Sequence, residues 1–201
     1  MDAPGRDLTR VVAFVRRQEA LVAGERGAET PEESVLREVM AGPDGDRLRP
    51  AVCGMLAALR FDAERDSRPI RAEALQRQVE RVGDAFVGSL WVCAGEPGLP
   101  PAGVRELARA ACLVHLLRDR EVDRTLGYEN RPPGPDGDPI ADSAWVGALA
   151  SEAEHRFTVG NAALSAPMRW RMRWLLRQYA GRYRRALGVL VPLPTILEPD
   201  R

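Results

Sequence analysis

The sequence predicts an all-α fold, and two observations carry that prediction. Apolar residues recur at three- and four-residue intervals through almost every segment, and no segment shows the alternation of a half-buried strand. Glycine and proline gather between these segments, where helices are expected to end. The 201 residues suit a single domain that is long enough to bury a core. We therefore expect about seven helices and no sheet.

Three helices are predicted in the first third of the chain. The first covers about residues 6–23, where apolar residues follow the helical period. In "TPEE", Thr30 is the expected N-cap, Pro31 the first helical residue and Glu33 the residue that closes a capping box. This second helix ends at the turn "GPDGD". A third helix covers about residues 48–64.

Four longer helices are predicted in the rest of the chain. The first of them opens after Pro69 and ends at Gly95. The others cover about residues 104–126, 143–164 and 166–188. The stretch "GYENRPPGPDGDPIAD" cannot continue a helix, because glycine or proline recurs at nearly every turn of it.

Composition excludes several classes of function. The formal net charge is zero, so no global field attracts the chain to nucleic acid or to an anionic membrane. All 29 basic residues are arginine, which leaves no lysine for Schiff-base chemistry. Cys53, Cys93 and Cys112 are isolated and odd in number, which argues against a disulfide framework and for a cytoplasmic location. The sequence shows neither a signal peptide nor a membrane-spanning apolar stretch.

The segment "LLRDREVDRTLGYENRPP" carries the main functional signal. His115, Asp119 and Asp123 are spaced four residues apart, so they share one face of a helix. Two like charges at that spacing repel each other unless a cation lies between them. Mg²⁺ is usually held by one or two carboxylates together with phosphate oxygens. The pair therefore has the chemistry to hold a diphosphate through metal, and the Arg118 guanidinium can also bind phosphate.

The same segment also fits a plain structural role. Arg118, Arg120, Glu121 and Arg124 surround the aspartates, so the helix end could be a solvated face with salt bridges. His115 could equally be an interior histidine with a hydrogen-bond partner. Spacing alone leaves both interpretations open.

A longer match favours the functional interpretation. "ACLVHLLRDREVDRTLGYENRPP" resembles the second aspartate-rich segment of the squalene/phytoene synthase family, the trans-isoprenyl diphosphate synthases of head-to-head type. The matching positions are His115, Leu117, Arg118, Asp119, Asp123, Gly127, Tyr128, Asn130 and Pro132. Flanking positions that also resemble the family are Phe61, Asp62, Ala63, Arg65, Arg68, Ile70, Ala153, Phe157, Gly160, Tyr179, Arg182 and Leu187. The resemblance is strongest over residues 45–190 of a single domain, residues 1–201, in which residues 189–201 form a tail.

The resemblance implies an isoprenoid-synthase-type helical bundle around an apolar cavity. It implies a prenyltransferase that uses Mg²⁺ to ionise an allylic prenyl diphosphate and transfers the prenyl group to an isoprenoid or another acceptor. Asp119 and Asp123 would be the catalytic metal ligands. The residues expected to bind the substrate are Arg118, His115, Tyr128 and Asn130. The aromatic residues Phe86, Trp91 and Phe157 are expected to be ordinary core.

The sequence departs from the family pattern at its start. The first aspartate-rich segment, of DDxxD type, is absent, and Asp2 is interpreted as its remnant. We therefore expect an N-terminally reduced bundle that lacks the first helices of the family fold. Three interpretations stay open: a fragment, a site completed by a homo- or hetero-oligomeric partner, and a non-catalytic homologue that binds a prenyl ligand. Gln78 also replaces a common tyrosine.

The predicted last helix raises alternatives from another class. "MRWRMRWLLRQYAGRYRR" holds seven arginines and no acidic residue, with aromatic residues between them. Such a composition is found in single-stranded nucleic-acid platforms and in interfacial membrane helices. The simpler interpretation buries Trp170, Trp174 and Tyr179 on one face and leaves the arginines outside. We favour it, expect no nucleic-acid partner, and keep peripheral membrane contact as the alternative that agrees with the resemblance.

Overall fold

The computed structural model describes residues 8–65, 68–134, 137–138 and 140–191. Within this part of the chain the structure consists of helices and turns, which confirms the predicted all-α fold. The helices are α1 (Leu8–Ala23), α2 (Pro31–Ala41), α3 (Gly45–Arg65), α4 (Ala72–Cys93), α5 (Ala102–Thr125), α6 (Asp142–Ala163) and α7 (Trp170–Leu190). Asp2 and nearly all of the predicted tail lie outside the described residues.

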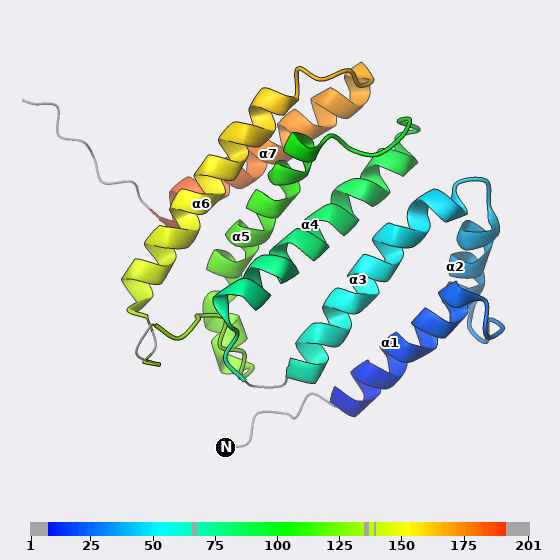
Figure 1. Ribbon diagram of the computed structural model, residues 1–201, viewed down its shortest axis with the longest axis horizontal. Helices are drawn as coiled ribbons and strands as arrows, with labels where there is room; N and C mark the ends of the chain where they lie inside the picture. The colour runs from blue at the N-terminus through cyan, green and yellow to red at the C-terminus, as the bar shows by residue number, and fades with distance from the viewer. Residues whose placement is uncertain (1–7, 66–67, 135–136, 139, 192–201) are drawn as a thin grey trace, which may run out of the picture.

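The helices pack as a layered bundle (Figure 1). Neighbouring contacts run from α1 to α3, from α3 to α4 and from α4 to α5, so these helices lie side by side. Helix α6 packs against α5, and α7 lies behind them in the view, against both. Helix α2 closes the end of the α1–α3 pair. Among the described residues, none of the helices has the length and apolarity needed to cross a membrane.

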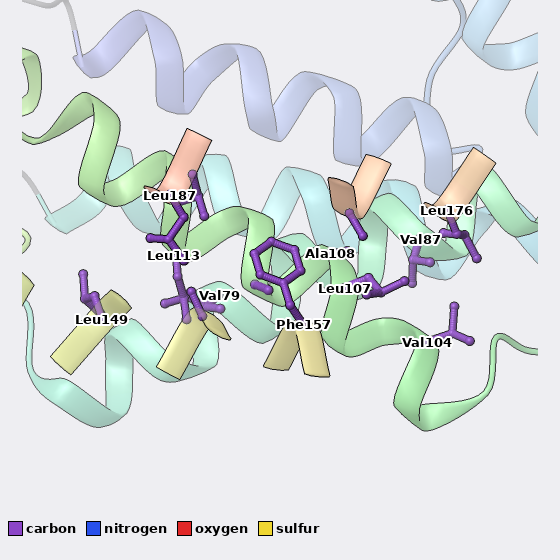
Figure 2. Close-up of a cluster of buried hydrophobic side chains, with 14 of the residues drawn as sticks. Val79, Val87, Val104, Leu107, Ala108, Leu113, Leu149, Phe157, Leu176 and Leu187 are labelled. Carbon is purple, nitrogen blue, oxygen red and sulfur yellow. The ribbon is translucent and has the colours of Figure 1, made fainter. Parts of the chain in front are cut away.

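Two apolar clusters hold these layers together. The larger one joins α4, α5, α6 and α7 around the fully buried side chains of Leu107 and Phe157 (Figure 2). A smaller one joins α1, α2 and α3 around Val15. Helices α5 and α6 approach closely at Gly160, where an added Cβ would collide with Leu107. The α5 helix is therefore fixed on several sides, and its remaining face is available for a site.

Two helix ends carry the local signals that the sequence predicts. Gly95 has φ of 69° and the N–H of Glu96 donates to the Trp91 carbonyl at 3.1 Å, which ends α4 as predicted. The Thr30 hydroxyl accepts from the N–H of Glu33 at 3.3 Å, which confirms the N-cap. The prediction that Glu33 closes a capping box is wrong. The Glu33 carboxylate accepts from the N–H of Glu29 at 2.8 Å, and not from the N–H of Thr30.

Two helices begin at residues that the sequence pattern does not predict. Helix α3 begins at Gly45, three residues before the predicted start, and includes Pro50 in its second turn. Helix α7 begins at Trp170, four residues after the predicted start. There the N–H of Arg169 donates to the carboxylate of Glu96 at 2.8 Å, and Glu96 is only 2% exposed. A buried carboxylate from the α4–α5 loop thus fixes the start of α7, which no local pattern could reveal.

The predicted burial of α7 is wrong for its tryptophans. Trp170 is 70% exposed and Trp174 is 58% exposed. The buried stripe of α7 consists of Met172, Leu176, Ala180 and Leu187. These residues follow the helical period, and that period places both tryptophans on the opposite side. Tyr179 is half-buried.

Two of the three aromatic residues that were expected in the core are buried, and the third is exposed. Phe157 and Trp91 are buried in the larger cluster, as expected. Phe86 is 39% exposed, so the prediction is wrong for this residue. Its ring stacks on Tyr179 with the two centroids 5.1 Å apart, at the surface between α4 and α7.

Candidate functional site

A cavity of about 270 Å³ opens beside the C-terminal half of α5, between α3 and α4. His115, Asp119 and Asp123 line it because their four-residue spacing places them on the same helical face. Tyr128 and Asn130, from the segment after α5, line it as well. The structure thus brings together five of the six residues that the sequence singled out.

The sixth residue, Arg118, lies outside the cavity. Its guanidinium holds Asp119 through two hydrogen bonds, from Nε at 2.7 Å and from Nη2 at 2.8 Å. Its side chain is 52% exposed. In this arrangement Arg118 binds the aspartate, so it would have to turn away from Asp119 to reach a phosphate group.

A backbone reversal after α5 brings the loop residues to the cavity. Gly127 has φ of 82°, a conformation that other residues adopt only with strain, and the N–H of Tyr128 donates back to the Asp123 carbonyl at 2.8 Å. The chain therefore turns back along α5. Asn130 then donates from Nδ2 to the Asp123 carboxylate at 2.8 Å. Gly127, Tyr128 and Asn130 of the motif therefore fold the segment after α5 back against Asp123.

The end of α3 completes the mouth of the cavity. Arg65 donates from Nη2 to Oδ1 of Asn130 at 2.8 Å, and its guanidinium carbon lies 5.3 Å from the centre of the Tyr128 ring. Asn130 consequently bridges Arg65 and Asp123. We call Arg65, Asn130 and Asp123 the mouth cluster. It joins the end of α3 to the end of α5 and the segment that follows it, 65 positions away in the sequence.

A third carboxylate lines the same cavity. Asp62, from α3, accepts from Nε2 of Gln78 at 3.2 Å, and the same Gln78 nitrogen donates to the Ala58 carbonyl at 3.0 Å. Gln78 stands where the resembled family often has tyrosine, and here it links α4 to α3. The wall behind these polar groups is mostly apolar, and is made by Ile70, Leu75, Val79, Val82, Cys112 and Leu116.

The surroundings of Asp119 keep its carboxylate charged, and the surroundings of His115 keep its imidazole neutral. The Arg118 guanidinium holds the pKa of Asp119 below its usual range. Burial lowers the pKa of His115, and repulsion from Arg118 lowers it further, so the imidazole is neutral at pH 7. Its Nε2 makes a 2.8 Å hydrogen bond with the Tyr183 hydroxyl. Burial raises the pKa of the Cys112 thiol to about 12, so this thiol is not a nucleophile.

An apolar groove of about 430 Å³ adjoins the cavity on the side of α7. Val82, Cys112 and His115 line both spaces, so the groove and the cavity share a wall. Its other walls are formed by Met55 of α3, Phe86 of α4, and the α7 residues Leu175, Gln178, Tyr179, Arg182 and Tyr183.

Sequence reasoning missed several residues of the site. Asp62 and Arg65 stand in the "FDAER" stretch that resembles the family, but nothing in the stretch itself indicates that they face a cavity. Tyr183 gave no signal, because its contact with His115 spans 68 positions of the chain. Only the packing of α7 against α5 brings these two side chains together.

Neither a ready-made metal centre in the described part of the chain nor a similar known protein identifies the site. Among the described residues, no group of three or more His, Cys, Asp or Glu side chains is arranged to hold a metal ion by itself. A scan against protein-family models finds no match to this chain, and neither a curated protein nor a solved structure is significantly similar to it.

Proposed function

We propose that the cavity beside α5 binds a prenyl diphosphate together with Mg²⁺, and that the chain transfers the prenyl group to an acceptor. One observation carries the proposal. Carboxylates crowd the mouth of the cavity while apolar side chains line its wall. A ligand with an anionic head, a bound cation and an apolar tail matches both halves.

The charge at the mouth supports a role for a cation. Asp62, Asp119 and Asp123 line the cavity, and Arg65 is the one guanidinium among the lining residues. A diphosphate alone would be repelled by this excess of negative charge. Two carboxylates one helical turn apart are oxygen donors of the kind that Mg²⁺ uses, with phosphate oxygens and water filling its other positions.

The same donors explain why ion and ligand should bind together. With no ready group of three donors among the described residues, the protein alone offers a weak site. Asp119 and Asp123 would hold the ion, and the diphosphate would supply further oxygen ligands. We therefore expect little binding of Mg²⁺ by itself and strong mutual dependence of ion and diphosphate.

The chemistry divides between the ion and the protein. A bound Mg²⁺ would neutralise the leaving diphosphate as the carbon–oxygen bond ionises. The protein's own groups orient the ligand and exclude water. Leu75, Val79 and Leu116 keep water from the allylic cation, so that an electron-rich acceptor can attack it before hydrolysis occurs.

A second candidate is binding of the prenyl ligand without transfer. The specific observation in its favour is Arg118, which occupies both oxygens of Asp119. That ion pair competes with a metal for the carboxylate, and a partly blocked ligand weakens the charge stabilisation that ionisation needs. This candidate shares the cavity and the ligand, and differs only in turnover.

The binding claim can be tested by thermal unfolding with farnesyl thiodiphosphate, a non-ionising analogue, with and without Mg²⁺. Ligand at about 100 times its dissociation constant adds about 2.7 kcal/mol. For a chain of this length that corresponds to a rise in Tm of about 5–10 °C. We expect this rise only when both components are present.

Two variants make the test specific to the site. Asp119→Ala should abolish the rise, whereas Glu121→Ala should keep it, because Glu121 lies on the same helix but does not line the cavity. A wild-type protein without an Mg²⁺-dependent rise would contradict the proposal. Prenyl product from purified chain with farnesyl diphosphate would support transfer, and binding without product would support the second candidate.

A further inference from the structure

We propose that the outward face of α7 is a docking surface for an anionic lipid bilayer. We define this α7 face by the exposed residues Trp170, Trp174, Arg177, Arg182 and Arg185. The α7 face does not overlap the carboxylate cavity, so its role is independent of the ligand bound there.

The first observation is the exposure of two large aromatic side chains. Trp170 and Trp174 lie one helical turn apart and are 70% and 58% exposed. Leu175 beside them is 38% exposed, and Val189 near the end of the helix is 81% exposed. Amphipathic tryptophan rings favour the headgroup region of a membrane, where the ring is partly desolvated and its N–H stays hydrated.

The second observation is positive charge without acidic partners. From Pro167 to Val191 the sequence contains no acidic residue. Arg184 pairs with Glu154 of α6 at 2.7 Å. Within the described ranges, Arg177, Arg182 and Arg185 make no salt bridge to a carboxylate. Arg177, Arg182 and Arg185 therefore place positive charge on the α7 face, which complements an anionic surface.

The third observation decides between a bilayer and a nucleic acid. The apolar groove next to α7 is lined by Leu175 and Arg182, and it adjoins the cavity beside α5. A bilayer surface at the α7 face would place acyl or prenyl chains at the entrance of that groove. A nucleic acid, which is a charged polymer, would leave the apolar groove unfilled. The Arg171 guanidinium also lies over the Trp170 ring at 5.5 Å, where it occupies a face that base stacking would need.

The surface can be tested by flotation of the full chain with vesicles. One set contains phosphatidylcholine alone, and the other contains equal parts of phosphatidylcholine and phosphatidylglycerol. We expect binding to the anionic vesicles that weakens as salt is added. Binding should also shift the tryptophan emission to the blue, because Trp91 and Trp145 are already buried and only the α7 pair can change environment.

Variants with matched controls connect the binding to the α7 face. Removing two arginines by Arg177→Gln with Arg185→Gln should weaken binding to anionic vesicles by about 30-fold. Trp170→Ser with Trp174→Ser should abolish the blue shift. Arg16→Gln with Arg37→Gln removes two exposed arginines from α1 and α2 and should change nothing.

Three results would overturn the proposal. The first is wild-type protein that does not float with anionic vesicles. The second is an equal loss of binding in the α1 and α2 arginine control. The third is tighter binding to a single-stranded RNA oligonucleotide than to vesicles, since that would make the α7 face a nucleic-acid surface. The blue shift of the wild type tests the surface even where a variant fails to fold.

Discussion

Asn130→Ala is the substitution that should most clearly open the mouth cluster. The Asn130 amide accepts from Arg65 at 2.8 Å and donates to Asp123 at 2.8 Å, so one side chain satisfies a guanidinium and a carboxylate at once. Truncation leaves both charged groups with one partner fewer. It also removes one of the contacts between the segment after α5 and the end of α3, where Arg65 still donates to the Glu129 carbonyl at 3.3 Å.

The size of the effect follows from these two contacts. A hydrogen bond to a charged group contributes about 1.5–3 kcal/mol to stability. All three side chains are only half-buried, so solvent screening reduces each contact to about 1 kcal/mol. We therefore expect a loss of about 2 kcal/mol, which for this length lowers Tm by about 4–8 °C.

Urea unfolding, with and without Mg²⁺ and farnesyl thiodiphosphate, measures this loss of stability. A double-mutant cycle with Arg65→Gln should give a coupling energy of at least about 0.5 kcal/mol, because the two side chains share a hydrogen bond. Asn161→Ala in α6 is the control, since the Asn161 side chain makes no hydrogen bond in the described part of the chain. If Asn130→Ala loses no more stability than this control, the mouth cluster does not hold the loop.

Three further outcomes are expected from other parts of the molecule. The Arg17 guanidinium and the N–H of Glu29 lower the pKa of Glu33 from its ordinary 4.5 to about 2. The stability that this provides is present above pH 4.5 and is lost as the pH falls toward 2. Glu33→Gln should therefore flatten the dependence of the unfolding free energy on pH in acid unfolding. Gly160→Ala should cost about 1–3 kcal/mol in urea unfolding, because α5 leaves no room for a methyl group, and an unchanged midpoint would contradict the close approach. A thiol reagent at pH 8 should modify the two exposed cysteines quickly and the half-buried Cys112, whose thiol pKa is raised, slowly; three equal rates would contradict the raised pKa.

Local sequence signals were sufficient to predict the helices. The helical period of the apolar residues identified each helix in the described part of the chain, and Gly95 and Thr30 marked helix ends. The errors arise where distant residues intervene. Glu33 makes contacts with α1 in place of a complete capping box, and Glu96 fixes the start of α7 from another loop. Such contacts span many positions, so no local window contains them.

The candidate site was predictable where it depends on one helix. The spacing of His115, Asp119 and Asp123 placed them on a common face, and the structure has all three lining one cavity. Their functional roles stay predictions. The contribution of Arg65 could not be foreseen, because it depends on where the end of α3 lies relative to the segment after α5. The position of Arg118 outside the cavity follows from its ion pair with Asp119, which the sequence pattern left open. Likewise, the exposure of the α7 tryptophans depends on which side of α7 meets the core.

Calorimetric titration of farnesyl thiodiphosphate tests the central claim most directly, namely that the two α5 aspartates bind the diphosphate through a divalent cation. We predict binding by wild-type protein in Mg²⁺ and none in EDTA. Asp119→Asn with Asp123→Asn, which removes both charges and keeps the side-chain volume, should bind no more tightly in Mg²⁺ than in EDTA. Equal affinity of the wild type in Mg²⁺ and in EDTA, or undiminished Mg²⁺-dependent affinity in the double variant, would contradict the account.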